Sequence, residues 1–413
     1  MKKYLALLLV LVMVLSLAAC ASKPAETTDE PEQTTTEPAP AEETKDEEPA
    51  PAEETKEEET TEEPADNTEY AVAMITDYGD ITDQSFNQTT YEACKAFCED
   101  NGVEFSYFKP AGDNTADRVA MIEKAVDEGY NVIVMPGYAF GGAIVEAAPE
   151  FPDVKFIALD VAKGDLLEAG VAKAGESYDY NPDNWDLEKY VDMSNVYCAI
   201  YQEELCGYMA GYAAVKLGYT KLGFLGGMAV PAVVRYGYGY VQGVDAAAKE
   251  LDITVDLKYA YGNQFSGDAD ITAAMDTWYQ GGTEIVFACG GGIYTSAAEA
   301  AAKVGGKVIG VDVDQSYISK LIVTSAMKQL QNVTELMLDT LNKGEWETYG
   351  GKVTNFGLLE GEYVGLPTDT WSMEHFTVDE YNAVKEQIRS GEIEVSNSTE
   401  AMPEVSITVN EIA

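Results

Sequence analysis

The chain has 413 residues and a formal net charge of −46 at pH 7, from 72 Asp and Glu residues against 26 Lys and Arg residues. So acidic a chain has no basic patch for binding a nucleic acid or an anionic lipid surface, and a strongly anionic substrate is equally unexpected. The one histidine, His375, lies in a polar C-terminal stretch. This argues against a Ser-His-Asp triad and a multi-histidine metal site, so we expect no cofactor, no metal and no catalysis.

Residues 1–19 are expected to be a signal peptide. Two lysines precede an apolar run over residues 4–17, which is shorter than the ~20 residues that a helix needs to cross a bilayer. The run ends in Leu-Ala-Ala-Cys20, a tetrapeptide that resembles a bacterial lipobox, so we expect cleavage before Cys20 and acylation of its thiol. The alternative is an ordinary secreted protein in which Cys20 has no special role.

Residues 20–68 are expected to form a disordered, acidic tether that starts at the lipidated Cys20. The segment 21–70 contributes −16 to the net charge and has no apolar residue larger than alanine before Tyr70. Such a composition buries too little apolar surface to offset the entropy of the chain. The tether would lift a folded body off the membrane.

The first part of the body alternates short apolar runs with amphipathic stretches, which indicates βαβ units and a parallel sheet. The expected strands are 70–75, 103–108, 132–135 and 156–159, and the expected helices begin near Ser85 and span 116–128 and 141–148.

Residues 163–194 interrupt this alternation with a polar, aromatic stretch that contains Asn-Pro-Asp-Asn-Trp at 181–185. Because the stretch is too long for a routine connection, we expect a surface excursion near a cleft or a lobe boundary. Tyr180 or Trp185 could then reshape the mouth of a pocket.

A second α/β series follows. The expected strands are 196–200, 221–225, 254–259, 284–288 and 308–311, and the expected helices are 203–217, 236–251, 271–279 and 296–304. Gly237, Gly239 and Gly243 imitate a dinucleotide-binding fingerprint, but their spacing is one residue too long. We expect these glycines to allow close packing of helices instead.

The body of about 345 residues exceeds what one hydrophobic core usually serves. Two similar series, neither long enough for a TIM barrel, predict an α/β protein with two Rossmann-like lobes joined by a hinge. We assign residues 69–197 and 328–352 to lobe 1, and residues 198–327 and 353–413 to lobe 2.

The body has five cysteines, an odd number, and none of them falls in a Cys-x-x-Cys pair. Cys94 and Cys98 are four residues apart on an expected helix, a spacing that favours neither a disulfide nor a complete metal site. We expect buried thiols, with a single bridge between Cys198 and Cys206 as the alternative.

Polar or glycine residues follow the expected strands, where ligands bind in an open α/β sheet. They are Asp77, Gly137, Tyr138, Asp160, Gly226, Gly227, Gly290, Gly291, Gly292 and Asp312. Near the first of these, Phe86 offers a face for a flat ring, and Asn87 offers a donor and an acceptor for its edge. The structural alternative is that Asp83 or Ser85 caps the helix and Phe86 packs inward.

Six short motifs carry a resemblance to a known family. They are Ile75-Thr-Asp77, Asp83-Gln-Ser-Phe-Asn-Gln88, Phe156-Ile-Ala-Leu-Asp160, Gly223-Phe-Leu-Gly-Gly-Met228, Cys289-Gly-Gly-Gly292 and Ile309-Gly-Val-Asp-Val-Asp-Gln315. Over roughly residues 70–395 the chain resembles the basic membrane protein family of bacterial lipoproteins, which includes purine nucleoside receptors of ABC transporters. The second and sixth motifs are specific to that family.

The resemblance implies a role for each of eight residues. Phe86 would stack on a base, with Phe265 as the second aromatic ring from the other lobe. Asp77, Asn87 and Asp160 would hydrogen-bond or orient the base. The remaining three are Asp312, which would accept from ribose hydroxyls, Lys328, which would reach the ligand from a hinge-crossing segment, and Gly291, which would line the site.

The resemblance further implies a type I periplasmic-binding-protein fold and a monomer. Such a protein is held by its lipid anchor on the extracytoplasmic face of the cell membrane, where it captures a nucleoside and delivers it to an ABC transporter permease. In the aromatic run that contains Tyr236 the family usually has phenylalanine, and we interpret Tyr236 as lobe packing rather than as a ligand contact.

Other classes of function stay open. A glycoside hydrolase would need two acids in one cleft, and the sequence leaves Asp160 with Asp312 as a candidate pair. Asp312 and Asp314 do not indicate a cation site, because alternate residues on a strand point to opposite faces. A receptor for a pentose or another sugar would use the same carboxylates and rings, and a surface antigen would bind no small molecule.

Overall fold

The computed structural model describes residues 70–77 and 79–412. The predicted signal peptide at 1–19, the tether at 20–68 and the lipidation of Cys20 lie outside these residues and stay predictions. Within the described ranges, none of the helices combines the length and the apolar character that crossing a bilayer demands.

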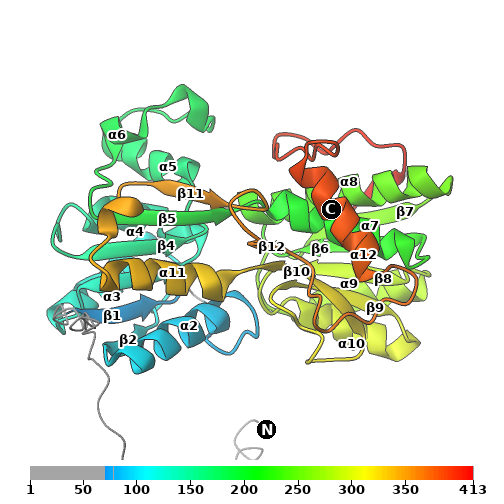
Figure 1. Cartoon of the computed structure of the whole chain (residues 1–413), viewed down its shortest axis with the longest axis horizontal. Coiled ribbons are helices and arrows are strands. Elements are labelled where there is room, and N and C mark those ends of the chain that lie inside the picture. Colours follow the sequence, from blue (N-terminus) through cyan, green and yellow to red (C-terminus); the bar gives the residue numbers. More distant parts are fainter. Residues whose placement is uncertain (1–69, 78, 413) are drawn as a thin grey trace, which may run out of the picture. The chain divides into compact units, whose positions relative to one another are not determined.

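The first lobe is built on a six-stranded sheet whose pairings are all parallel, in the order β11-β5-β4-β3-β1-β2 (Figure 1). Its strands are β1 (Ala71–Ile75), β2 (Glu104–Phe108), β3 (Val132–Pro136), β4 (Lys155–Leu159), β5 (Val196–Tyr201) and β11 (Val353–Phe356). Its helices are α2 (Phe86–Asn101), α3 (Thr115–Asp127), η1 (Tyr138–Phe140), α4 (Gly141–Ala147), α5 (Lys163–Lys173), η2 (Pro182–Asn184), α6 (Leu187–Tyr190), α11 (Leu330–Asn342) and η3 (Trp346–Thr348). The central strands are apolar and buried on both faces, as a parallel sheet covered by helices requires.

The second lobe has a seven-stranded sheet in the order β12-β10-β9-β8-β6-β7-β13, in which only β12 runs antiparallel to its neighbour. Its strands are β6 (Lys221–Gly226), β7 (Asp256–Tyr261), β8 (Ile285–Cys289), β9 (Lys307–Asp312), β10 (Ile322–Lys328), β12 (Val364–Gly365) and β13 (Thr408–Glu411). Its helices are α7 (Glu203–Lys216), α8 (Pro231–Leu251), α9 (Ala269–Gln280), α10 (Tyr294–Val304) and α12 (Val378–Arg389).

The chain passes between the two sheets three times: from β5 to α7, from β10 to α11, and from β11 to β12 (Figure 1). The predicted lobe boundaries at 197/198 and 352/353 are therefore corrected. Strand β5 continues in the first sheet to Tyr201, and β11 joins the same sheet because Val353–Phe356 pairs with Cys198–Tyr201. The third predicted boundary, at 327/328, shifts by one residue, because Lys328 still belongs to β10 of the second sheet, whereas the following helix α11 packs on α2 of the first lobe.

The interpretation of residues 163–194 as one excursion is wrong in its first part. Helix α5 is an ordinary crossover between β4 and β5, and it buries Leu166, Leu167 and Val171. Its glycines weaken the amphipathic pattern that would have indicated it. Gly170 is nevertheless needed, because a side chain there would press on the backbone oxygen of Tyr190. Only the segment between α5 and β5, with η2 and α6, departs from the regular alternation.

The predicted role of the α8 glycines is confirmed for Gly239 and Gly243, whereas Gly237 faces Tyr259 and Phe224 of the sheet. A Cβ atom at Gly239 or Gly243 would collide with the backbone oxygen of Glu204 or Tyr208 on α7. Gly207 and Gly211 on α7 face α8 in the same way. The two helices therefore lie with their backbones in direct contact.

The five cysteines of the body are free and buried, as predicted, and the alternative of a bridge between Cys198 and Cys206 is wrong. Burial raises the pKa of all five thiols, the pKa of Cys98 to about 12. They are therefore protonated, unreactive parts of the core.

Candidate functional site: a cleft between the two lobes

A cavity of about 560 Å³ lies at the carboxyl ends of strands from both sheets, within the range usual for small-molecule sites. The structure brings all eight predicted site residues to its wall: Asp77, Phe86, Asn87, Asp160, Phe265, Gly291, Asp312 and Lys328. Their placement follows from topology, because parallel strands end at one edge of a sheet. Their contact with a ligand stays a prediction.

The start of α2 is organised by Asp83. Its carboxylate accepts the backbone N–H groups of Ser85, Asn87 and Gln88 at 2.9–3.1 Å, and the Asn87 side-chain amide at 3.1 Å. A carboxylate only accepts, so the amide nitrogen of Asn87 must face Asp83. Its Oδ1 is then buried without a hydrogen-bond partner among the described residues. Asp83 thus caps the helix and also orients the Asn87 side chain so that its acceptor, Oδ1, points away from Asp83.

Both sequence interpretations of Phe86, inward packing and a place at the site, agree with the structure, since the residue packs against the buried core and also lines the cavity. On the same wall, Asp77 follows β1 and its Oδ1 accepts the N–H of Gly79 at 2.6 Å. A Cβ at Gly137 would stand 3.2 Å from Asp77 Oδ2, so a glycine after β3 leaves room for this carboxylate.

Phe265 packs directly against glycines that follow strands of the second sheet. A Cβ at Gly227, after β6, or at Gly290, after β8, would collide with its ring. Gly291 has a φ of 51°, in the left-handed region that favours glycine, and a Cβ there would stand 2.8 Å from the backbone oxygen of Phe265. Gly291 therefore acts through its backbone, by letting Phe265 approach.

Asp160, directly after β4, and Asp312, the last residue of β9, adopt the left-handed conformation, with φ values of 61° and 66°. Non-glycine residues adopt it rarely and at some energetic cost, and such residues concentrate at functional sites. Asp312 Oδ2 accepts the hydroxyl of Ser85 at 2.5 Å, and Gln315 Nε2 donates to the backbone oxygen of Gln84 at 3.0 Å. These two hydrogen bonds join the lobes.

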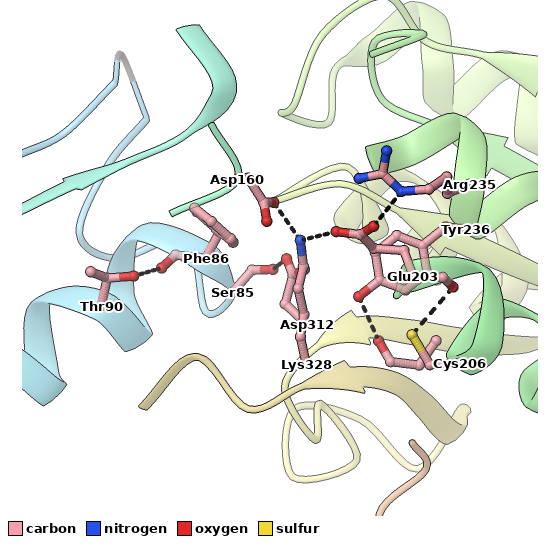
Figure 2. A network of polar contacts seen from close by, with 11 residues as sticks. Ser85, Phe86, Thr90, Asp160, Glu203, Cys206, Arg235, Tyr236, Asp312 and Lys328 are labelled. Atoms are coloured by element: carbon pink, nitrogen blue, oxygen red, sulfur yellow. Dashed lines mark hydrogen bonds and ion pairs between the residues drawn. The ribbon is translucent and has the colours of Figure 1, made fainter. Parts of the chain in front are cut away.

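Lys328, the last residue of β10, is 3% exposed and supplies the buried cation of the cavity. Figure 2 shows its ammonium between Asp160 Oδ2 and Glu203 Oε1, the latter at 3.3 Å. The same nitrogen lies over three aromatic rings. These are Phe86 at 4.9 Å, Tyr201 at 5.3 Å and Tyr236 at 5.5 Å from the ring centroids.

The ionisation of this cluster follows from burial and pairing. Burial raises the pKa of Asp160 to about 6, although the charge of Lys328 opposes the rise. Burial also raises the pKa of Asp312. For Lys328, burial alone would lower the pKa, but Asp160 and Glu203 more than reverse this, so its pKa is raised. At neutral pH the lysine is therefore a cation and Asp160 is largely ionised.

The structure extends the sequence interpretation of Tyr236 and corrects that of Tyr180 and Trp185. Tyr236 is lobe packing, as interpreted, and its hydroxyl donates to the backbone oxygen of Ala326 at 3.3 Å, but it also lines the cavity. Tyr180 and Trp185 do not line the cavity. They form their own aromatic group, in which Tyr178 contacts both rings.

Sequence reasoning missed Glu203, Arg235 and the cross-lobe hydroxyl of Ser85. An acid in the first turn of a helix and a serine before one are ordinary helix-start signals. Only the fold reveals that Glu203 reaches Lys328 and that Ser85 reaches Asp312.

Two curated relatives match most of their own length. The ABC transporter nucleoside-binding protein BmpA of Lactococcus lactis subsp. cremoris (strain MG1363) is 28% identical over 317 residues, 71% of this chain and 80% of the relative. Basic membrane protein B of Borreliella burgdorferi (strain ATCC 35210 / DSM 4680 / CIP 102532 / B31) is 27% identical over 326 residues, 77% of this chain and 86% of the relative.

Two solved structures show the same fold. A solute-binding protein of an ABC transporter system from Aeropyrum pernix K1 has a TM-score of 0.63 and 20% identity, covering 80% of this chain and 94% of that one. One from Conexibacter woesei DSM 14684 has a TM-score of 0.59 and 21% identity, covering 79% and 99%. The predicted α/β fold of the type I periplasmic-binding-protein class is thus confirmed.

The match to a family covers almost all of the body. Residues 70–399 match the Bmp family, described as ABC transporter substrate-binding protein PnrA-like. This confirms the family resemblance predicted from the six motifs, and the relatives named above are described as nucleoside-binding, solute-binding or basic membrane proteins. The chain therefore belongs to the PnrA-like family of ABC transporter substrate-binding proteins.

Proposed function

We propose that the protein captures a purine nucleoside in the cleft between its lobes and delivers it to an ABC transporter permease. The observation that carries the proposal is the pairing of aromatic side chains from opposite lobes, Phe86 and Phe265, in one cavity with buried, unsatisfied acceptors. A relative with 28% identity is named as a nucleoside-binding protein.

A nucleoside matches the two ends of such a cavity. Its base is flat and presents N–H donors, which suit an aromatic face and the acceptor oxygens of Asn87 and Asp77. Its ribose presents hydroxyl donors, which suit ionised carboxylates. Asp160 Oδ1 is buried without a partner in the described part of the chain, and Asp312 lies on the same wall. A free sugar would use only the second half of this arrangement.

The remaining parts of the proposal concern the membrane. An acylated Cys20 would hold the protein on the extracytoplasmic face, and the acidic segment 20–68 would give the body reach toward the permease. The body itself would act as a monomer without chemistry of its own. The support is the lipobox-like Leu-Ala-Ala-Cys20 sequence together with membership in an ABC substrate-binding family.

Isothermal titration of the purified body against guanosine, adenosine, inosine, cytidine, ribose and galactose tests the ligand. We expect tight binding of at least one purine nucleoside and weak binding of the free sugars. Tight binding of free sugars alone would contradict the proposal and favour a sugar receptor. Native mass spectrometry of the freshly purified protein provides an independent check by weighing any ligand that stays bound.

A further inference from the structure

We infer that Glu203 and Arg235, neither of which lines the cavity, are positioning residues that hold Lys328 for ligand capture. The inference rests on the proposed function, because it gives these two side chains a part in the same binding event. Figure 2 shows the contacts that carry it, which run from Arg235 to Glu203, from Glu203 to Lys328, and from Lys328 to Asp160.

Glu203 divides its two carboxylate oxygens between two cations. It is the first residue of α7, directly after the chain has left the first sheet, and it is fully buried. Its Oε1 accepts from Lys328 Nζ at 3.3 Å, and its Oε2 accepts from Arg235 Nε at 2.7 Å. Glu203 lies at the crossing from β5 to α7 and Lys328 at the crossing from β10 to α11, so this carboxylate links two of the three crossings, and through Arg235 it also reaches α8.

Stability alone is a poor explanation for this arrangement. Removing charges from water costs several kcal/mol per ion, and an apolar replacement of a buried ion pair is often as stable. Helices α7 and α8 already pack backbone to backbone through their glycines. What Glu203 and Arg235 do fix is the ammonium of Lys328, which ends a long, flexible side chain and is also attracted by Asp312.

The position of Lys328 decides what Asp160 can offer to a ligand. The ammonium contacts Asp160 Oδ2, whereas Oδ1 has no hydrogen-bond partner within the described ranges. Attraction by Glu203 keeps the ammonium from moving onto both oxygens of Asp160. Glu203 thereby leaves one carboxylate oxygen available to a ligand donor, and Arg235 holds Glu203 in place.

The charged groups around this cluster come from six elements or their ends. The pKa of Asp160, after β4, responds to the charges of Lys328 on β10, Glu203 on α7 and Asp312 on β9. The pKa of Arg235, on α8, responds to Glu203, Glu204 and Asp160. The pKa of Asp165, on α5, responds to Arg235 and Asp160. The negative charge of Glu203 adds to the rise that burial causes in the pKa of Asp160. Neutralising Glu203 therefore lowers the pKa of Asp160.

The test compares the full mature chain with Glu203→Gln, which keeps the shape of the side chain and removes its charge. Titration with guanosine should give an affinity lower by about 10-fold to 100-fold, the scale of a lost hydrogen bond to a charged group. Glu204→Gln is the matched control, because Glu204 is the buried neighbour on the same helix and its Oε2 contacts no donor among the described residues. Because Glu204 acts on Arg235 rather than on Lys328, the affinity of this variant should stay far closer to that of the wild type than the affinity of Glu203→Gln.

Two further measurements separate positioning from packing. The double variant Glu203→Gln/Arg235→Gln should bind better than Glu203→Gln alone, since it no longer leaves the buried cation of Arg235 without its carboxylate partner Glu203. In the ligand-free protein, carboxyl-carbon NMR of labelled Asp, assigned with Asp160→Asn, should show the pKa of Asp160 falling below its value of about 6 in Glu203→Gln. Melting curves establish that each variant is folded.

The outcomes distinguish the two proposals. If no purine nucleoside binds to the wild type, the proposed function fails, while the NMR titration of Asp160 still tests the positioning. An unchanged pKa of Asp160 in Glu203→Gln overturns the inference. So does wild-type affinity in that variant, or a double variant whose losses simply add.

Discussion

The hydroxyl of Ser85 offers the sharpest test of how the two lobes close. It is fully buried and donates to Asp312 Oδ2 at 2.5 Å, from the start of α2 in one lobe to the end of β9 in the other. Ser85 lies at the N-cap position of α2, but its side chain does not cap the helix; Asp83 accepts the backbone N–H groups instead. Ser85→Ala should therefore weaken the contact between the lobes and leave the helix intact.

The size of the effect follows from the charge of the acceptor. A hydrogen bond to an ionised carboxylate contributes about 1.5–3 kcal/mol. Since the bond joins the two lobes, it favours a closed over an open form, and its loss should shift that equilibrium toward the open form by about 10-fold to 100-fold. If the ligand-free protein is mostly open, the dissociation constant rises by the same factor, because only the closed form completes the site.

Titration calorimetry with a nucleoside measures the affinity, and spin labels at the exposed Glu123 and Glu299, one in each lobe, report the distance between lobes. Thr90→Ala is the control. It removes a buried hydroxyl whose hydrogen bond, to the backbone oxygen of Phe86 at 2.9 Å, stays within α2 (Figure 2). Equal losses in both variants, or an unchanged distance distribution in Ser85→Ala, would refute a closing role for Ser85.

Three further predictions use independent measurements. Phe86→Ala should weaken nucleoside binding by about 1–3 kcal/mol without unfolding the body, as measured by calorimetry and thermal melting; unchanged affinity would remove Phe86 from the site. Burial raises the pKa of Asp165 to about 7, so its contribution to stability is present at acid pH and is lost as the pH rises through 7. Asp165→Asn should therefore raise the melting temperature more at pH 8 than at pH 5. Deleting residues 23–66 should leave the affinity of the purified protein intact while impairing nucleoside uptake by cells; a loss of affinity would give the segment a part in binding.

The site could be predicted from the sequence where strand ends determine it. Asp77, Asp160 and Asp312 each follow an apolar run, and parallel strands bring such positions to one edge. The same rule predicted that the glycines after β6 and β8 lie at the site, but it did not predict what they do there. These glycines make room for the ring of Phe265. Phe265 lies in the loop after a third strand, β7, and no local sequence pattern specifies the path of that loop.

Long-range pairing explains the errors in the fold. Strand β11 has only two large apolar residues, Val353 and Phe356, and its partner β5 lies about 150 positions earlier in the chain. Long-range pairing, rather than the local sequence, decides which sheet such a short edge strand joins. The local alternation of apolar and polar residues therefore could not assign β11 to a lobe. Helix α5 was missed for a local reason, because its two glycines interrupt an apolar face that the packed structure completes.

The charges of the cavity link the acidity of the chain to the kind of ligand proposed. Among the described residues that line it, five are aspartates and two are lysines: Asp77, Asp80, Asp83, Asp160, Asp312, Lys109 and Lys328. Both lysines already have carboxylate partners, Lys109 with Asp80 at 3.2 Å and Lys328 with Asp160 and Glu203. A phosphate group would therefore enter a site with excess negative charge and would have to displace an existing ion pair. A neutral nucleoside brings a flat ring and N–H and O–H donors without a formal charge, which is why the arrangement favours a nucleoside over its phosphate.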